Sequence, residues 1–218
     1  TRATSTRTTA RGADGKPGVI YLADRLKEAT GLHVRITNDA NAAARGEHTY
    51  GTAKGINDFI MLTLGTGVGS GIISHGRLVY GHDGFAGELG HVCVIQDGRQ
   101  CNCGLKGCLE TYASAMGVAR TAREILQNDS RESLLRNLDP EKISSKDIYD
   151  AAVQGDQLAK EIFAFTGRIL GRAMGDFVKF SSPKAIVLFG GLTKSREFFH
   201  DEMVKAMNDN LMQIWKNK

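Results

Sequence analysis

Three of the four cysteines in this 218-residue chain lie within eight residues, and a histidine lies ten residues before the first of them. Together they form the spacing H-x9-C-x-C-x4-C, made by His91, Cys101, Cys103 and Cys108. Structural zinc sites take four ligands from cysteine and histidine, so this set predicts one zinc ion. Two disulfides are the alternative, but a bridge within so short a loop would be strained, and nothing marks the chain as secreted. Cys93, between two valines, is expected to be a small core residue.

Two glutamates lie beside the predicted zinc ligands. Glu88 comes three residues before the histidine, and Glu110 comes two residues after the last cysteine. Gly104 and Gly107 would let the backbone fold tightly around the ion. One metal-bound loop would then position two carboxylates, so we expect these glutamates to be functional, although exposed glutamates usually are not.

Two predicted strands end in glycine-rich turns. The first turn, in "LTLGTGVGSG", contains Gly65, Thr66, Gly67, Gly69 and Gly71. Glycines let backbone N–H groups approach an anion closely, and the threonine adds a hydroxyl donor. The loop lacks the Gly-Lys-Ser/Thr ending of a Walker loop, and a hairpin follows it instead of the helix of a Rossmann motif. A plain tight turn is the alternative, but "VLFGGLTKS" repeats the arrangement at Gly190-Gly191, which favours a nucleotide between the two turns.

Asp39 follows a predicted strand and lies at a predicted helix start, in "TNDANAA". A frequent role of aspartate at such a place is the N-cap, which stabilises a helix by about 1 kcal/mol. The functional alternative is a base, because the helix dipole stabilises a carboxylate anion at that end. Such a carboxylate would orient a hydroxyl group and accept its proton late in a phosphoryl transfer.

Helices are predicted where apolar residues recur at helical spacing. The segment "VIYLADRLKEATG" is one, with Gly31 as its stop, and "NDANAAARGEHTYG" is another, entered through Asn38 or Asp39. Residues 111–179 are mostly helical in pattern, and residues 195–215 are helical throughout. The last two helical segments account for most of the second half of the chain.

Strands are predicted between the helices. Alternation predicts a strand at "HVRIT", and continuous apolar runs predict buried strands at "DFIMLTLG" and "KAIVLFGG". The segment "IISHGRLVYG" is typical of a hairpin that turns at His75-Gly76. Strands that alternate with helices indicate an α/β fold.

Composition argues against a membrane span and against nucleic acid. The chain is 41% hydrophobic, enough for a core, but has no apolar run of about 18 residues. Its net charge of +4 includes Arg2, Arg7 and Arg11 of an opening segment without acids, so the remainder carries only +1. That opening has no large apolar residue and no helical or strand-like spacing of apolar residues, so residues 1–18 are expected to form a disordered or atypical tail. No signal peptide is visible, and a cytoplasmic location is expected.

Three stretches together resemble the ROK family of repressors and sugar kinases, within the actin-like ATPase superfamily. They are "NDANAA", "LGTGVGSGII…GFAGELGH" and "CNCGLKGCLE", and the resemblance runs from about Val19 to the C-terminus. It implies an actin-like ATPase (ribonuclease H-like) fold, mostly the larger C-terminal domain with a loop held by zinc. The chain is most similar to the glucokinases of the family. This implies ATP-dependent phosphorylation of a hexose, most of all glucose, at its 6-hydroxyl.

The resemblance also implies a role for each matching residue. Asp39 would be the catalytic base for the sugar 6-hydroxyl. The residues that hold the sugar would be Asn38, Glu88, His91 and Glu110, with one ring nitrogen of His91 on the sugar and the other on zinc. The residues near ATP would be Gly65, Thr66 and Gly67 at the phosphates and Gly190 and Gly191 at the adenosine. Mg²⁺ would accompany ATP, and Zn²⁺ would be structural.

The sequence departs from the family pattern at both ends. The D-x-G-G-T-type phosphate loop that opens the smaller N-terminal domain does not occur, and the late small-residue motif is absent. We therefore expect residues 19–37 to be a remnant of the smaller domain and residues 38–218 to be the larger ROK domain, incomplete at its end.

The alternatives within the family are a sugar-responsive transcriptional repressor and an N-acetylhexosamine kinase. A repressor needs the sugar but not the base, so Asp39 favours a kinase. The expected partners are a hexose and ATP, with a homodimer for the full-length protein, and neither nucleic acid nor membrane.

Overall fold

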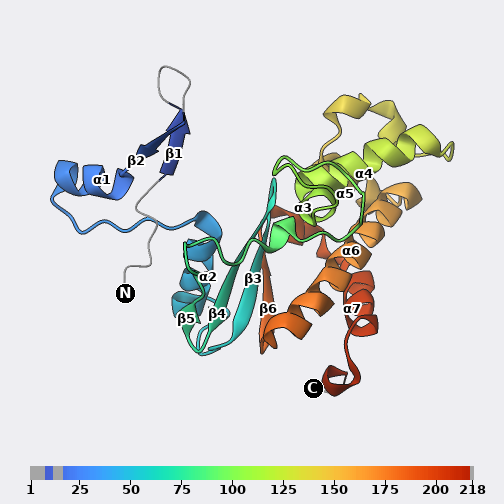
Figure 1. The fold of residues 1–218 in the computed structure, drawn as a ribbon. Coiled ribbons are helices and arrows are strands. Elements are labelled where there is room, and N and C mark those ends of the chain that lie inside the picture. Colours follow the sequence, from blue (N-terminus) through green and yellow to red (C-terminus); the bar gives the residue numbers. More distant parts are fainter. Residues whose placement is uncertain (1–7, 12–16, 217–218) are drawn as a thin grey trace.

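The computed structural model describes residues 8–11 and 17–216, and its centre is a four-stranded sheet (Figure 1). The strands lie in the order β5-β4-β3-β6, with β3 antiparallel to β4 and parallel to β6. Their bounds are β3 (Phe59–Leu64), β4 (Val68–Ser74), β5 (Arg77–Leu78) and β6 (Ala185–Phe189). The predicted hairpin turn is confirmed: His75 and Gly76 both have positive φ, 50° and 71°, as a two-residue type I′ turn requires.

Helices cover both faces of this sheet, which confirms the predicted α/β architecture (Figure 1). Successive side chains of a strand point to opposite faces, and β3 follows this rule. Its Phe59 and Met61 share a small core with Ala44 of α2 (Asp39–Tyr50), whereas Ile60 and Leu62 belong to the larger core on the other face. The helices on that side are α3 (Glu110–Ala113), α4 (Ala115–Asn128), α5 (Ser145–Val153), α6 (Gln157–Ser181) and α7 (His200–Asp209).

The longest helix, α6, begins at a buried aspartate. Asp156 caps it by accepting the N–H of Ala159 at 2.9 Å. It also accepts the N–H of Leu134 at 2.6 Å and the hydroxyl of Ser133 at 2.7 Å. Burial by itself raises the pKa of this carboxyl, but the hydrogen bonds outweigh it and hold the pKa below its usual value. The charged form of Asp156 therefore joins the start of α6 to the loop that follows α4.

Two predictions for the C-terminal third need correction. Strand β6 is only half-buried, because it pairs with β3 on one side and lies at the edge of the sheet, where Phe189 is 54% exposed. The helix predicted over 195–215 is divided into α7 and two 3-10 helices, Gly191–Phe198 and Gln213–Trp215. The first break lies at Phe199, whose buried side chain packs in the large core while its backbone leaves the helical region at φ −129°.

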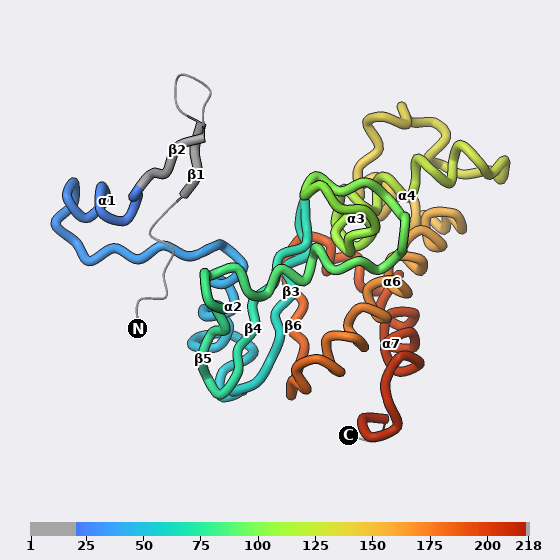
Figure 2. The backbone as a smooth tube through the Cα atoms, in the orientation of Figure 1, coloured from blue at the N-terminus to red at the C-terminus, as the bar shows by residue number. Residues whose placement is uncertain are grey.

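The N-terminal part of the chain stands apart from the sheet (Figure 2). Helix α1 (Leu22–Thr30) ends as predicted at Gly31, with φ 70°, and residues 31–38 then run in extended form to α2. The strand predicted at "HVRIT" is wrong, because residues 33–37 belong to no strand. Strand β1 (Thr8–Arg11), in the predicted tail, pairs antiparallel with β2 (Pro17–Ile20), which extends beyond it, and the rest of the tail lies outside the described residues. The helix predicted from Val19 therefore begins only at Leu22, because Val19 and Ile20 belong to β2. In the described part of the chain, no helix is long and apolar enough to cross a membrane.

Candidate functional site

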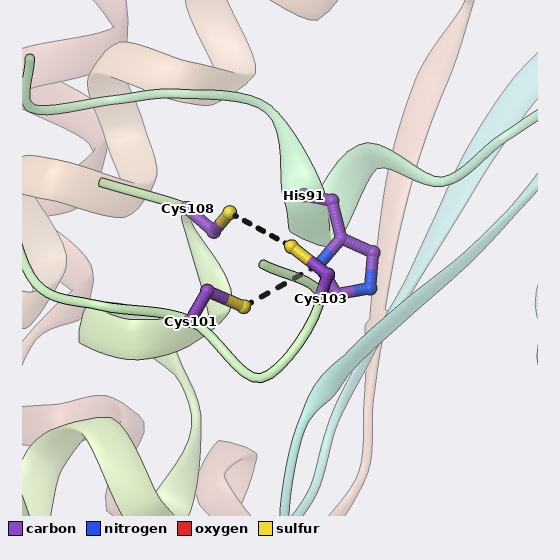
Figure 3. A group of neighbouring side chains, drawn as sticks. All are labelled: His91, Cys101, Cys103 and Cys108. Carbon is purple, nitrogen blue, oxygen red and sulfur yellow. Dashed lines mark hydrogen bonds between the residues drawn. The ribbon is translucent and has the colours of Figure 1, made fainter. Parts of the chain in front are cut away.

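The predicted zinc ligands come together in the structure (Figure 3). One ligand atom from each of His91, Cys101, Cys103 and Cys108 lies within 4.8 Å of the other three. Cys101 Sγ is 3.7 Å from His91 Nδ1, and Cys103 Sγ is 3.6 Å from Cys108 Sγ. A tetrahedral zinc ion, about 2.3 Å from sulfur and about 2.0 Å from nitrogen, keeps its ligand atoms roughly 3.5 to 3.8 Å apart. The four side chains therefore fit one zinc ion, and because all four cysteines of the chain are free, the disulfide alternative is wrong.

A small hairpin carries the three cysteine ligands. The N–H of Cys101 donates to the carbonyl of Leu105 at 2.9 Å, and the N–H of Gly104 donates to the carbonyl of Cys101 at 3.1 Å. Gly104 and Gly107 have φ of 94° and 76°, a region that favours glycine. Burial raises the pKa of the Cys101 thiol and raises that of Cys108 to about 12. A metal ion bound by these thiols would have to displace their protons.

Cys93 is not part of this cluster, and the prediction that it is a core residue is wrong. Its side chain is exposed and lines an open cleft between α6 and α7. Its backbone forms an isolated antiparallel bridge with Cys108. The neighbouring Val92 is 39% exposed. Valines on both sides of Cys93 thus do not indicate that it is buried: Val94 packs against the large core, whereas Cys93 faces the cleft.

Glu110 connects the zinc cluster to the first glycine turn. It is the first residue of α3, and its Oε1 accepts the thiol of Cys101 at 3.4 Å and lies 3.9 Å from His91 Nδ1. Its other oxygen, Oε2, accepts the N–H of Val68 at 3.3 Å, at the end of the turn. A Cβ atom on Gly67 would collide with Oε2, so the glycine makes room for this carboxylate. The functional role expected for Glu110 thus has a defined place, between the metal ligands and the turn.

Asn38, and not Asp39, is the N-cap of α2. The Oδ1 atom of Asn38 accepts the N–H of Asn41 at 2.7 Å. Asp39 is the first helical residue, is exposed, and accepts the N–H of Ala40 at 2.8 Å. The alternative role of Asp39 as the cap is therefore wrong, and its carboxylate lies at the positive end of the helix dipole.

Close packing against β4 fixes the position of α2. A Cβ atom on Gly69 would lie 3.0 Å from Ala40 Cβ, and one on Gly71 would lie 3.1 Å from the Ala40 carbonyl oxygen and close to Ala44. These two glycines were expected to admit an anion, but in the structure they admit the helix. The sequence analysis did not predict this close packing of helix on strand. The small side chains of the alanines in "DANAAA" were the feature that could have indicated it.

One cavity of about 480 Å³ collects most of the predicted catalytic and nucleotide residues. Those that line it are Asp39, Gly65, Thr66, Gly67 and Gly190, and Glu110, which was predicted to bind the sugar, lines it as well. Gly190 has φ 109° and lies against the carbonyl of Leu64 at the end of β3. Thr63 and Phe189 also line the cavity, and nothing in the sequence marked them. Residues from α2, β3, the first turn, α3 and the end of β6 thus meet around one space.

The remaining predicted residues lie outside the wall of this cavity: Asn38, Glu88, His91 and Gly191. Glu88 is exposed, and its carbonyl accepts the N–H of His91 at 3.1 Å in the short helix Leu89–His91. Ser70 of β4 holds this loop: its hydroxyl donates to the Gly87 carbonyl and accepts the Leu89 N–H at 3.1 Å. The loop of Glu88 and His91 is therefore anchored to the strand that follows the first turn.

A model of the ROK family matches residues 16–218. The chain belongs to the ROK family. The glucokinase of Thermotoga maritima is 38% identical to this ROK chain over 195 residues, which cover 88% of the chain. The same match covers 61% of that glucokinase, so the chain spans less than two thirds of its length.

Two solved ROK structures resemble the chain over 95% of its length. One is a glucokinase from Streptomyces griseus in complex with glucose and AMPPNP, with a TM-score of 0.81 and 35% identity, of which 68% is covered. The other is a ROK transcriptional regulator, a homolog of the Escherichia coli MLC protein, with a TM-score of 0.83 and 28% identity, of which 52% is covered. The expected actin-like ATPase fold is confirmed, and fold alone does not separate a kinase from a regulator.

Proposed function

We propose that this chain is part of an ATP-dependent hexose kinase that phosphorylates the 6-hydroxyl of its sugar, with glucose as the expected substrate. The observation that carries the proposal is the cavity shared by Asp39, Glu110 and the turn at Thr66-Gly67. A sugar kinase needs a base, a group that binds hydroxyls and a turn that binds phosphate, all in reach of one another. The similarity to two glucokinases supports the same activity.

Asp39 is the proposed base. Its carboxylate would accept a hydrogen bond from the sugar 6-hydroxyl, orient the oxygen toward the phosphorus atom, and take the proton as the phosphoryl group transfers. Because Asn38 caps the helix, this carboxylate is not needed for capping.

The two glycine turns would bind ATP. Backbone N–H groups of Gly65, Thr66 and Gly67 and the threonine hydroxyl would contact the phosphates, and Gly190 and Gly191 would lie near the adenosine. Mg²⁺, when bound with ATP, would offset the charge that develops on the transferred group. The cavity brings Gly190 to the same space as the first turn, which supports a nucleotide between them.

The sugar would be held from the side of the zinc cluster. Glu110 would bind hydroxyl groups from its position in the cavity wall, and Glu88, His91 and Asn38 would complete the set. The zinc ion would be structural, holding His91 and the cysteine hairpin in place. Charge-assisted hydrogen bonds from hydroxyls to carboxylates of this kind contribute about 1.5 to 3 kcal/mol each.

The proposal is tested by Asp39→Asn in the complete gene product that contains this chain. We expect kcat to fall by about 10²-fold or more, with a much smaller change in the KM for the sugar. Asp24→Asn is the matched control, because Asp24 is also an aspartate in the first turn of a helix, α1, but does not line the cavity. Near-normal kcat for Asp39→Asn, with thermal unfolding unchanged, would show that Asp39 is not the base.

A sugar-responsive regulator is the second candidate, supported by the structural similarity to the ROK regulator. A regulator would bind a sugar yet consume no ATP with any hexose. A coupled assay of ATP consumption with glucose, mannose, N-acetylglucosamine and N-acetylmannosamine separates the two functions and also tests the N-acetylhexosamine kinase alternative. Phosphorylation of glucose above the others is the expected outcome.

The domain organisation and the oligomeric state are part of the same proposal. Residues 19–37 would belong to the smaller domain of the kinase and residues 38–218 to its larger domain. Helix α1 supports this division, because it buries only Ala23 and exposes Leu22 and Leu26, as a piece of a separate domain would. The complete protein is expected to be a homodimer, which light scattering after size-exclusion chromatography would test.

A further inference from the structure

Arg99 lies at the base of the cysteine hairpin, two residues before the first cysteine ligand, and it is buried, with its side chain only 7% exposed. Its carbonyl accepts the N–H of Gly107 at 2.8 Å, which closes the hairpin just before Cys108. Its own N–H donates to the hydroxyl of Tyr112, in α3, at 2.9 Å. The backbone of Arg99 therefore already joins the metal-binding hairpin to the helix that begins with Glu110.

The guanidinium group of Arg99 uses all of its donors. An arginine has five N–H donors in a fixed planar fork. Nη1 donates to the carbonyls of Thr111 and Gly117 at 2.6 and 3.2 Å. Nε and Nη2 donate to Glu124 Oε2 at 3.1 and 2.6 Å, and Nη2 also donates to the Thr121 hydroxyl at 2.8 Å. These five bonds satisfy the group, and no other side chain offers this fork.

The positions of these acceptors show what the side chain holds. Thr111 directly follows Glu110 in α3, while Gly117, Thr121 and Glu124 lie along α4. The guanidinium carbon also lies 4.4 Å above the ring of Tyr112. One buried residue thus fixes the hairpin, the helix that carries Glu110 and α4 from Gly117 to Glu124 to one another.

We propose that Arg99 is a positioning residue that sets the zinc ligands of the hairpin and the Glu110 carboxylate in one fixed arrangement. The effect on sugar binding rests on the function proposed above, whereas the effect on metal binding does not. Arg99 is not one of the proposed ligands of the metal or of the sugar. It acts through its backbone on Cys101 and Cys108 and through its side chain on Glu110.

Lysine cannot replace arginine in this role. It keeps the charge, but its single ammonium group has three donors and no planar fork, so it cannot reach carbonyls and a carboxylate on two helices at once. A residue that merely supplied a buried positive charge for Glu124 would be replaced by lysine with little effect. Arg99→Lys therefore separates positioning from charge.

The experiment compares Arg99→Lys with Arg131→Lys in the complete gene product. Arg131 also binds carboxylates, those of Asp129 and Glu161, beyond the C-terminal end of α4. Zinc affinity is measured by competition with a chromophoric chelator. For Arg99→Lys we expect a fall of about 10- to 100-fold, the range found for groups that orient metal ligands, and no change for Arg131→Lys. We also expect the KM for the sugar to rise by about tenfold, with kcat and the KM for ATP close to wild type.

Equal zinc affinity in the two variants and the wild type would overturn the proposal, and so would an equal rise in the KM values for sugar and ATP. Loss of zinc affinity in a protein that phosphorylates no hexose would support the role of Arg99 while refuting the proposed function. If Arg99→Lys does not fold, Tyr112→Phe serves instead, because it removes only the hydroxyl that accepts the Arg99 N–H. Tyr112→Phe should then also lower the affinity for zinc, and an unchanged zinc affinity would count against the proposal.

Discussion

Gly67→Ala tests the link between the first glycine turn and Glu110, the carboxylate proposed to bind the sugar. The added methyl group would collide with Glu110 Oε2, which now accepts the N–H of Val68 at 3.3 Å. Because a carbon–oxygen contact relaxes to about 3.5 Å, the carboxylate must retreat by about 1 Å. Gly67 does not have positive φ, so alanine brings no backbone strain.

We expect the fold to survive, because the colliding atom is the end of a flexible side chain. Sugar binding should weaken, because a displaced Glu110 loses a charge-assisted hydrogen bond of about 1.5 to 3 kcal/mol, which corresponds to about 10- to 100-fold in affinity. The assay is calorimetric titration with glucose, together with the KM for glucose.

Gly46→Ala, in α2, is the matched control for this change. A Cβ atom there meets nothing within 4 Å, so sugar affinity should stay as in the wild type. Equal glucose affinity for Gly67→Ala, Gly46→Ala and the wild type would refute the reasoning that places Glu110 in the sugar site.

Three further changes should have distinct effects. Cys103→Ser should abolish the binding of one zinc per chain, whereas Cys93→Ser should retain it, as elemental analysis of the purified variants would show. Asp156→Asn should cost about 2 to 3 kcal/mol in urea unfolding at pH 7, because hydrogen bonds to a charged acceptor are lost. The pKa of Asp156 is lowered in the folded state, so its charge stabilises the fold at pH values above its unfolded-state pKa of about 3.9. The difference in the free energy of unfolding between the wild type and Asp156→Asn should therefore shrink as the pH falls below that value. Gly190→Ala should destabilise the fold by about 1 to 3 kcal/mol. A residue with a side chain is strained at φ 109°, and its Cβ atom would collide with the Leu64 carbonyl. An unchanged melting temperature would contradict this expectation.

Features that depend on local pattern were predictable from the sequence. The predicted zinc ligands lie close along the chain, so their residue types and spacing sufficed to predict that these four side chains form a cluster. The start of α2 followed from cap chemistry, although only the structure shows that Asn38 is the cap and that Asp39 is not. The hairpin at His75-Gly76 was equally local, since the turn conformation depends on two residues.

Features that depend on distant partners were not predictable. Residues 33–37 alternate like a strand, but a strand needs a neighbour, and neighbours are not encoded in the segment itself. Cys93 has apolar neighbours in sequence, yet nothing in the sequence tells what covers it. The contact between Glu110 and Val68 joins residues 42 positions apart, and the side-chain hydrogen bonds of Arg99 reach residues 12 to 25 positions away. Such contacts follow from tertiary packing and not from a motif.

The contact between α2 and β4 limits how this protein can vary. Its four residues, Ala40, Ala44, Gly69 and Gly71, are already the two smallest amino acids, so every substitution among them by a larger one adds volume in the same direction. Added volume moves the start of α2 away from the sheet, and Asp39 moves with it. An added methyl group at this contact would therefore lengthen the distance between Asp39 and the turn at Thr66-Gly67. If Asp39 is the base, as proposed, a larger side chain here would be accepted only with a compensating change elsewhere.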